Sequence, residues 1–495
     1  MRHVRQCAPL LAAALDLRRP SKRCLRRARR DFRGDEVTTF GVEDPASLEI
    51  IAQVPDQGPD EARVAVDRAA AAFADWSRTS PRHRSDVLRR AFDLMMRDSE
   101  ELTGLITSEN GKSLVDAAAE VGYAAEFFRW FSEEAVRPSG EYGEAPTGGV
   151  RTIVTHRPVG VAALVTPWNF PAAMVTRKIA PALAAGCTVV LKPAAETPLT
   201  ALAVGRILSE AGVPDGAVEI VTTTDAPGVV TAWLSDDRVR KVSFTGSTGV
   251  GRALLHQAAD RVLNASMELG GNAPVVVTDD ADLGAAVAGT MIAKFRNSGQ
   301  ACTAANRIFV HNDVAFDFVA RLGAAVEKLS VGPAIDGAAI GPLITQAALQ
   351  RVTEAVDFAV REGARISHQA QLPEAPGYFF PPTVLAGLAP DATILREEIF
   401  GPVAPVVVWH DEDELLELVN DTEYGLAAYV FAGDIGRAVR LGERIDAGMV
   451  GINRGLVSDP SAPFGGVKQS GLGREGAREG LREFQETQYL SVDWS

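Results

Sequence analysis

Residues 160–171 have the sequence GVAALVTPWNFP. The first six residues are almost all apolar, which is typical of a parallel strand buried on both faces. Two prolines flank Trp168 and Asn169, and they predict a turn directly after the strand. A helix is then predicted over residues 172–185, because Gly186 is suited to ending one. The segment as a whole predicts one strand–turn–helix unit.

The same order of elements returns further along the chain. Strands are predicted over residues 187–191, 218–221 and 239–244, and helices over residues 199–211 and 252–259. Alternating strands and helices predict a doubly wound parallel sheet. Ligands of such sheets bind at the carboxyl ends of the strands. Because Asn169, Lys192, Gly246 and Ser247 lie at such ends, they predict a nucleotide site, although a glycine turn alone is a weak signal.

The flanking segments complete the predicted architecture. Residues 60–131 have helical periodicity, with Asp60 expected as the first N-cap. A second α/β unit starts with a strand at residues 275–277 and contains the segment FRNSGQACT, which ends at Thr303. Residues 488–492 predict an edge strand, which we expect to dock on another subunit.

Composition excludes several classes of protein. Of the 495 residues, 46% are hydrophobic and 23% are charged, as expected of a globular protein. No apolar run reaches the roughly 18 residues of a membrane span. The four cysteines form no CxxC pair and the seven histidines no HxxxH pair, so we expect a reduced, cytoplasmic protein without a metal site. The net charge of −14 argues against binding nucleic acid.

Residues 1–34 form a basic tail that differs from the rest of the chain. Residues 1–33 contain 11 Lys and Arg and two Asp, a net charge of +9. Several interpretations stay open: an Arg-rich transit peptide, a basic binding tail, a disordered extension, or a start site placed too early. We expect this tail to be disordered and to take no part in the fold.

Three side chains together predict covalent catalysis on a carbonyl group. Cys302 is placed in a polar turn, where we expect an exposed thiolate able to attack. Asn169 and a backbone N–H are suited to hold the resulting oxyanion, and Glu268, in the apolar segment MELGG, is suited to activate water. Each has an ordinary alternative: a core cysteine, a turn-forming asparagine, and a capped or paired acid.

At these residues the sequence resembles the aldehyde dehydrogenase superfamily, from about Asp35 to Val492. The matching segments are residues 167–171, 192–193, 244–247, 267–271, 299–302, 397–402 and 463–466. The resemblance implies that Cys302 is the nucleophile, Glu268 the base, and Asn169 with the Cys302 N–H the oxyanion site. It also implies three parts: a doubly wound parallel-sheet cofactor domain, an α/β catalytic domain and a small β oligomerisation element. We place the cofactor domain at 35–136 and 159–269, the catalytic domain at 270–473, and the oligomerisation element at 137–158 and 474–495.

The resemblance also assigns residues to the cofactor, NADP or NAD. Phe400 would lie beside the nicotinamide ring and Glu398 would hold its ribose, and Trp168 would also belong to the cofactor site. Gly246 and Ser247 would hold the pyrophosphate, and Lys192 the adenosine ribose. In NAD-preferring members a glutamate occupies the place of Ala195, so we expect NADP to be preferred here. Glu196, one residue later, is expected to point away from Lys192 and leave it without a close carboxylate.

Within the family the sequence is most similar to succinate-semialdehyde dehydrogenases, which implies a short carboxylated aldehyde as substrate. Arg177, Arg296 and Ser458 match the residues that hold the substrate carboxylate in those enzymes. The alternative is that the arginines sit in structural ion pairs. Ala304 replaces the second cysteine of some relatives, and residues 459–462 diverge, which leaves the substrate length open.

Other functions stay open at this point: oxidation of a different aldehyde, a dehydrogenase that passes its thioester to coenzyme A, or a non-catalytic protein on the same fold. Glu268 argues against the second, and the intact set of Cys302, Glu268 and Asn169 against the third. We expect a homodimer or homotetramer that binds neither nucleic acid nor membrane.

Overall fold

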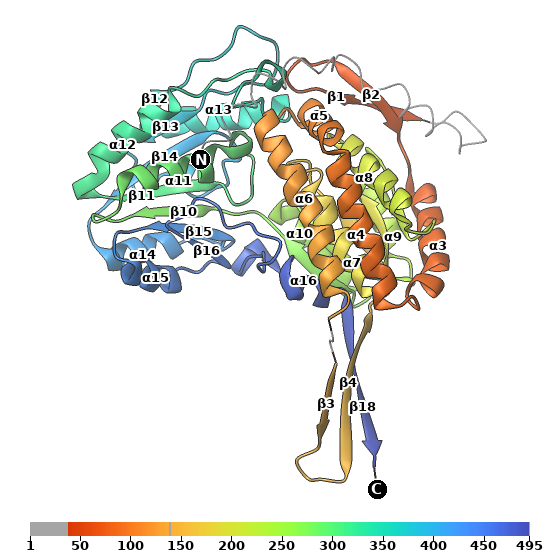
Figure 1. The fold of residues 1–495 in the computed structure, drawn as a ribbon. Coiled ribbons are helices and arrows are strands. Elements are labelled where there is room, and N and C mark those ends of the chain that lie inside the picture. Colours follow the sequence, from red (N-terminus) through yellow and green to blue (C-terminus); the bar gives the residue numbers. More distant parts are fainter. Residues whose placement is uncertain (1–37, 138–139, 495) are drawn as a thin grey trace.

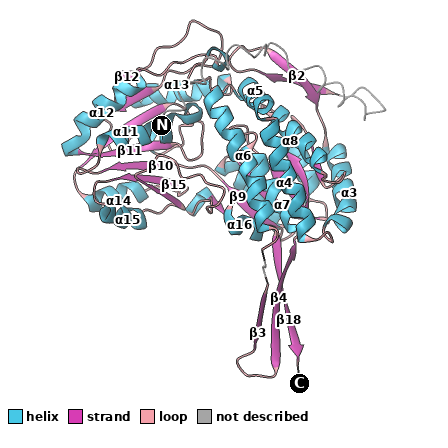
Figure 2. Cartoon of the chain, viewed as in Figure 1, coloured by secondary structure: helices cyan, strands magenta, loops and turns pink. Residues whose placement is uncertain are grey.

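The computed structural model describes residues 38–137 and 140–494. The basic tail predicted for residues 1–34 lies outside the described residues. Figure 1 shows two α/β halves side by side, and a narrow sheet that extends away from one of them. Helices cover the sheets of both halves, whereas the projecting element consists of strands (Figure 2).

The N-terminal segment is a small antiparallel pair followed by four helices. The strands are β1 (Thr39–Glu43) and β2 (Ile50–Pro55), and the helices are α3 (Pro59–Trp76), α4 (Pro81–Arg97), α5 (Ser99–Asn110) and α6 (Leu114–Glu134). The prediction that Asp60 is the first N-cap is wrong. Gly58 is the N-cap, and its N–H donates to Glu61 Oε2 at 2.9 Å. Asp60 lies inside the first turn, where a negative charge still suits the helix dipole.

The first large sheet has the predicted parallel, doubly wound form. Its strands are, in spatial order, β17 (Gly471–Leu472), β9 (Asn264–Glu268), β8 (Val239–Thr245), β5 (Val161–Val165), β6 (Thr188–Lys192) and β7 (Val218–Ile220). Only β17 is antiparallel. Its helices are α7 (Ala173–Ala185), α8 (Pro198–Ala211), α9 (Ala226–Leu234) and α10 (Thr248–Ala259). All five residues of β5 are buried, which confirms the reading of the apolar run.

The second large sheet carries the nucleophile. Its strands are, in spatial order, β12 (Arg365–Gln369), β13 (Thr383–Ala386), β14 (Val403–Trp409), β11 (Ala305–His311), β10 (Ala273–Val277), β15 (Ala427–Phe431) and β16 (Met449–Ile452). Only the edge strand β12 is antiparallel. Its helices are α11 (Leu283–Phe295), α12 (Asn312–Val326), α13 (Gln346–Arg361), α14 (Glu412–Asn420) and α15 (Ile435–Arg444).

The two sheets are joined so that opposite ends meet. The chain leaves β9 at Glu268 and enters β10 at Ala273, only a few residues later. The carboxyl ends of the first sheet therefore face the amino ends of the second, where Cys302 precedes β11. The first sheet follows the rule that ligands of parallel sheets bind at the carboxyl ends of the strands. The second sheet contributes its nucleophile from the opposite end.

The projecting sheet combines segments from the middle and the end of the chain. β4 (Val150–Pro158) lies between β3 (Glu141–Glu144) and β18 (Gln485–Asp493), and both pairings are antiparallel. The prediction of an edge strand near residues 488–492 is confirmed. A short helix, α16 (Ala477–Arg482), leads into β18 and contacts α6 and α7.

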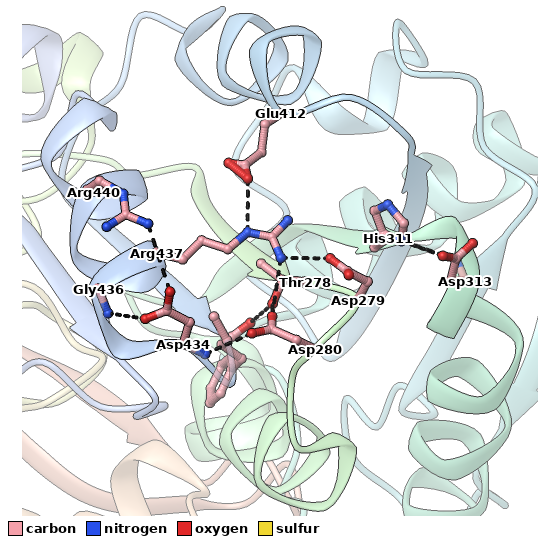
Figure 3. Close-up of polar contacts among 12 residues, drawn as sticks. Thr278, Asp279, Asp280, His311, Asp313, Glu412, Asp434, Gly436, Arg437 and Arg440 are labelled. Carbon is pink, nitrogen blue, oxygen red and sulfur yellow. Dashed lines mark hydrogen bonds and ion pairs between the residues drawn. The ribbon is translucent and has the colours of Figure 1, made fainter.

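At the carboxyl end of the second sheet, one arginine joins three acidic side chains (Figure 3). Arg437 of α15 pairs with Asp279 and Asp280 after β10, at 2.7 and 3.3 Å, and with Glu412 of α14 at 2.9 Å. Asp280 also accepts from the N–H of Asp434 at 2.7 Å. The Arg437 guanidinium holds the pKa of Asp279 below its ordinary value. These contacts connect α14 and α15 to the carboxyl end of β10. Cys302 lies at the opposite end of the sheet, before β11.

Residues 38–137 and 140–494 contain neither a metal-ligand cluster nor a helix suited to span a membrane. No group of three or more His, Cys, Asp or Glu side chains is placed to hold a metal ion. No helix combines the length and the apolar character needed to cross a membrane.

Candidate active site

Cys302, the predicted nucleophile, follows a tight turn between α11 and β11. Asn297, Ser298 and Gly299 are all left-handed, with φ of 51, 56 and 73°. A side chain at Gly299 would overlap the carbonyl oxygen of Gly401, so the turn requires glycine at this position. This turn leads the chain directly to Cys302 at the mouth of β11.

The expectation that Cys302 is an exposed thiolate is wrong. The residue is only half-exposed, and burial raises the pKa of its thiol to about 12. The guanidiniums of Arg177 and Arg296 lower this pKa, whereas the carboxylates of Glu398 and Glu268 raise it further. The thiol is therefore the resting form, and attack requires that a base remove its proton.

The oxyanion site has the expected partners close together. Asn169 follows β5, is buried, and donates through Nδ2 to the carbonyl oxygen of Gln300 at 3.2 Å. This bond directs its amide at the loop that carries Cys302. Within residues 38–137 and 140–494, no acceptor is found for the N–H of Cys302, which leaves it available to an oxyanion.

Glu268 ends β9 and is buried, with the charged side chains of Glu475 and Arg177 near it. Only 3% of its surface is exposed, and its Oε2 has no hydrogen-bond partner in the described chain. Burial raises the pKa of Glu268 well above its ordinary value, and the nearby carboxylate of Glu475 raises it further. A carboxylate destabilised in this way is a strong proton acceptor, as a general base requires.

The side chains expected to hold the nicotinamide end of the cofactor lie close to one another. Phe400 has a positive φ of 51° and packs edge-on against Trp168, with 5.4 Å between ring centres. Glu398 accepts from the N–H of Gly271 at 3.3 Å, and burial raises its pKa to about 7. These groups lie where the two sheets meet.

The phosphate and ribose positions lie on the first sheet. Gly246 follows β8 and Ser247 is the N-cap of α10, but the Ser247 side chain does not cap that helix. The first N–H groups of α10 are thus suited to bind a phosphate. Burial lowers the pKa of Lys192, at the end of β6, while the Glu196 carboxylate raises it. Glu196 itself is exposed, Ala195 is half-buried, and no ion pair between Lys192 and Glu196 is found among the described residues, so the expectation that Lys192 has no close carboxylate stays a prediction.

The three groups expected to bind the substrate carboxylate differ in their surroundings. Arg177 is 1% exposed, pairs with Glu475 at 3.1 Å, and donates to Tyr123 Oη at 2.9 Å. The alternative of a structural ion pair therefore holds for Arg177. Arg296 is half-buried and lies over the ring of Phe170, 5.1 Å from its centre.

No carboxylate partner of Arg296 is found among the described residues. Ser458 is half-buried and makes no hydrogen bond within that same part of the chain. Both are free to bind a ligand.

Sequence reasoning missed a set of buried charged residues that lie behind the predicted site. Glu475 accepts from Lys178 at 2.6 Å as well as pairing with Arg177, and it comes from the far end of the chain. Lys112 and Glu120, both fully buried, form an ion pair against the Asn169 turn. No motif or spacing marks these residues, because their partners are distant in sequence. Only an unexplained Lys or Glu in an otherwise apolar helix would have pointed to them.

The structure brings the half-buried thiol of Cys302, the amide of Asn169 and the buried carboxylate of Glu268 to the junction of two α/β sheets, an arrangement suited to covalent chemistry on a carbonyl group. The aldehyde dehydrogenase family matches residues 32–490, and the chain belongs to that family. It is an NAD(P)-dependent oxidoreductase of the aldehyde dehydrogenase type.

Three relatives place it more narrowly. It is 50% identical to a succinate-semialdehyde dehydrogenase of Paenarthrobacter nicotinovorans, over 90% of this chain and 99% of that protein. It is 46% identical to a glutarate-semialdehyde dehydrogenase of Pseudomonas aeruginosa, over 92% of this chain and 95% of the relative. The crystal structure of an E. coli NADP-dependent enzyme superposes with a TM-score of 0.90 at 44% identity, covering 92% and 95% of the two chains.

Proposed function

We propose that the enzyme oxidises succinate semialdehyde, or a similarly short aldehyde with a terminal carboxylate, to the acid. The observation that carries this proposal is Arg296, a half-buried cation without a carboxylate partner in the described chain. It begins the turn that leads to Cys302, so a carboxylate bound to it would lie close to the nucleophile. A guanidinium and a carboxylate form a strong, charge-assisted pair. The names of the two semialdehyde dehydrogenases to which the chain is similar support the same substrate class.

Ser458 would add a hydroxyl donor to the same carboxylate. Arg177 is neutralised by Glu475, so it would contribute mainly by shaping the pocket and by lowering the pKa of Cys302. Its direct contact with substrate stays a prediction. A cationic substrate would meet Arg296 with like charge and would be rejected.

Acylation begins when Cys302 loses its proton to a base, for which Glu268 has a suitably raised pKa. The thiolate sulfur adds to the carbonyl carbon and forms a thiohemiacetal oxyanion. Asn169 Nδ2 and the Cys302 N–H donate to that oxygen, which stabilises the charge as it develops. Collapse of the oxyanion expels hydride and leaves a thioester on Cys302. NADP or NAD, when bound, supplies the hydride acceptor.

Deacylation uses the same carboxylate a second time. Glu268, once free of the first proton, takes one from water, and the hydroxide adds to the thioester carbon. The second oxyanion collapses with release of the Cys302 thiolate and the carboxylic acid. The buried setting of Glu268 favours this hydrolysis over transfer to coenzyme A.

For the cofactor, we propose that the enzyme uses NADP in preference to NAD. Lys192 would hold the adenosine ribose, and the Gly246–Ser247 turn the pyrophosphate, where free N–H groups of α10 suit an anion. Ala195 leaves space where NAD-preferring members place a glutamate. Glu196 acts electrostatically on Lys192, but its side chain is exposed and can turn away from a 2′-phosphate.

A panel of aldehydes tests the substrate. Purified enzyme should reduce cofactor fastest with succinate semialdehyde, should be slower with butanal, and should be indifferent to added coenzyme A. Arg296→Met should raise KM for succinate semialdehyde by about 10- to 100-fold, because a charge-assisted hydrogen bond contributes about 1.5–3 kcal/mol. KM for butanal should barely change. Equal effects on both aldehydes would remove Arg296 from substrate binding, and release of an acyl-coenzyme A would favour the acylating reaction.

Assembly and location are further parts of the proposal. The projecting sheet exposes both of its edge strands, β3 and β18, which suits pairing between copies in a homodimer or homotetramer. We retain the cytoplasm as the site of action and the domain boundaries given above. One detail refines those boundaries: β17 returns to the first sheet just before residue 473.

A further inference from the structure

The turn that carries Asn169 is held by a segment that takes no direct part in the chemistry. This segment, residues 109–120, runs from the end of α5 into α6 and is called here the 109–120 clamp. Asn110 Nδ2 donates to the carbonyl oxygen of Trp168 at 3.0 Å, and Lys112 Nζ donates to that of Asn169 at 2.9 Å. Two successive carbonyl groups of the turn are therefore fixed by side chains of the clamp.

The same clamp also fixes the helix that follows the turn. The N-cap of α7 is Ala172, which has no side chain able to cap a helix. Glu120 performs this task from α6, because its Oε1 accepts from Ala172 N at 2.8 Å and from Ala173 N at 3.2 Å. Its other oxygen is bound by Lys112, and both side chains are completely buried. Burying an ion pair removes two charges from water, and this cost often exceeds the free energy that their attraction contributes to folding.

A third contact reaches the nucleophile loop. Asp116 Oδ2 accepts from the N–H of Asn297 at 2.8 Å, in the left-handed turn before Cys302. Asn297 Nδ2 donates to the carbonyl oxygens of Asn169, at 2.9 Å, and Gln300, at 3.0 Å. Because Asn169 Nδ2 also donates to Gln300, the oxyanion amide and the nucleophile loop form one closed hydrogen-bonded ring.

We propose that the buried Lys112–Glu120 pair is a positioning device, which acts through Asn169 by holding its amide at the oxyanion of the reacting carbonyl. This inference rests on the proposed function. An oxyanion donor must lie about 2.7–3.1 Å from the developing charge, and a shift of about 1 Å removes much of its effect. Lys112 and Glu120 are positioning residues, since they contact neither the sulfur nor the predicted substrate groups.

A double-mutant cycle tests the inference. Lys112→Met should lower kcat by about 10- to 100-fold, a part of the 10²–10³ lost when an oxyanion donor is removed. KM and cofactor affinity should change little. Misfolded molecules are removed by size-exclusion chromatography, and each rate is expressed per Cys302 thiol titrated in the folded fraction. If Lys112 acts through Asn169, Lys112→Met with Asn169→Ala should be no slower than Asn169→Ala alone.

Two additional variants separate positioning from folding. Lys241 is also buried and pairs with Glu483 at 3.5 Å on the first sheet, so Lys241→Met is the matched control and should keep the wild-type kcat per thiol. If Lys112→Met does not fold, Lys112→Met with Glu120→Gln removes the unpaired charge and serves in its place.

Two results would overturn the inference: an unchanged kcat per thiol, or effects of Lys112→Met and Asn169→Ala that multiply. A wild-type rate for Asn169→Ala would instead refute the oxyanion step of the proposed function.

Discussion

Replacing Arg177 by methionine should destabilise the fold, and the size of this effect distinguishes a structural role of the arginine from a role in substrate binding. In the structure it is 1% exposed and pairs with Glu475 at 3.1 Å, while its guanidinium lies 4.1 Å from the centre of the Phe464 ring. Removing one partner of a buried pair typically costs about 3–5 kcal/mol, because the other charge is left without compensation. Lys178 still binds Glu475 at 2.6 Å, so we expect a loss of about 3 kcal/mol.

The assay is urea unfolding followed by tryptophan fluorescence. Arg177→Met should move the midpoint to clearly lower urea, and adding Glu475→Gln should recover most of the loss, because the buried charge is then gone. Arg296→Met is the matched control, since that arginine has no carboxylate partner in the described chain, and its midpoint should hardly move. Wild-type stability of Arg177→Met, together with a selective rise in KM for succinate semialdehyde, would refute this reasoning and make Arg177 a substrate ligand.

Three further predictions concern the chemistry and the cofactor. Cys302→Ala should abolish aldehyde oxidation and keep cofactor binding, and Glu268→Gln should slow both thioester formation, followed as the first turnover of reduced cofactor, and thioester hydrolysis, followed by intact mass; substantial activity of either variant would contradict its assigned step. Burial raises the pKa of Glu398 from 4.5 to about 7, so its contribution to stability is complete below pH 4.5 and is lost as the pH rises through 7. Glu398→Gln should remove this loss of stability at high pH. A variant whose stability depends on pH just as the wild type's does would disprove the assignment to Glu398. Ala195→Glu should shift kcat/KM toward NAD, and a wild-type enzyme that already prefers NAD would contradict the reading of Ala195.

Local pattern was enough to predict the first sheet and the place of its ligands. The apolar run of β5 and the residues after it needed only knowledge of strand and helix periodicity. Asn169 and Lys192 then lay at one edge because parallel strands end together. These predictions held because each depends on residues that are neighbours in sequence.

Predictions failed where burial is created by distant segments. The loop of Cys302 is polar in sequence, yet residues from both sheets enclose it and raise the pKa of the thiol. The ion pair of Arg177 with Glu475 was equally hidden, although the contact of Arg177 with substrate stays a prediction; the same carboxylate pairs with Lys178 across 297 positions of sequence. Lys112 follows a helix break at Gly111, where a lysine is ordinarily solvated. No pattern of neighbouring residues reveals such partners.

The order of strands in the projecting sheet determines when this sheet can be completed during synthesis. His156 of β4 and Thr487 of β18 face each other but are 331 positions apart in the chain. At about 5–20 residues per second, a ribosome needs roughly 15–65 s to add that length. During this time β4 has β3 beside it and an open edge on its other side. That edge closes only after β18 has been made, so for this interval one edge of β4 is available to foreign strands.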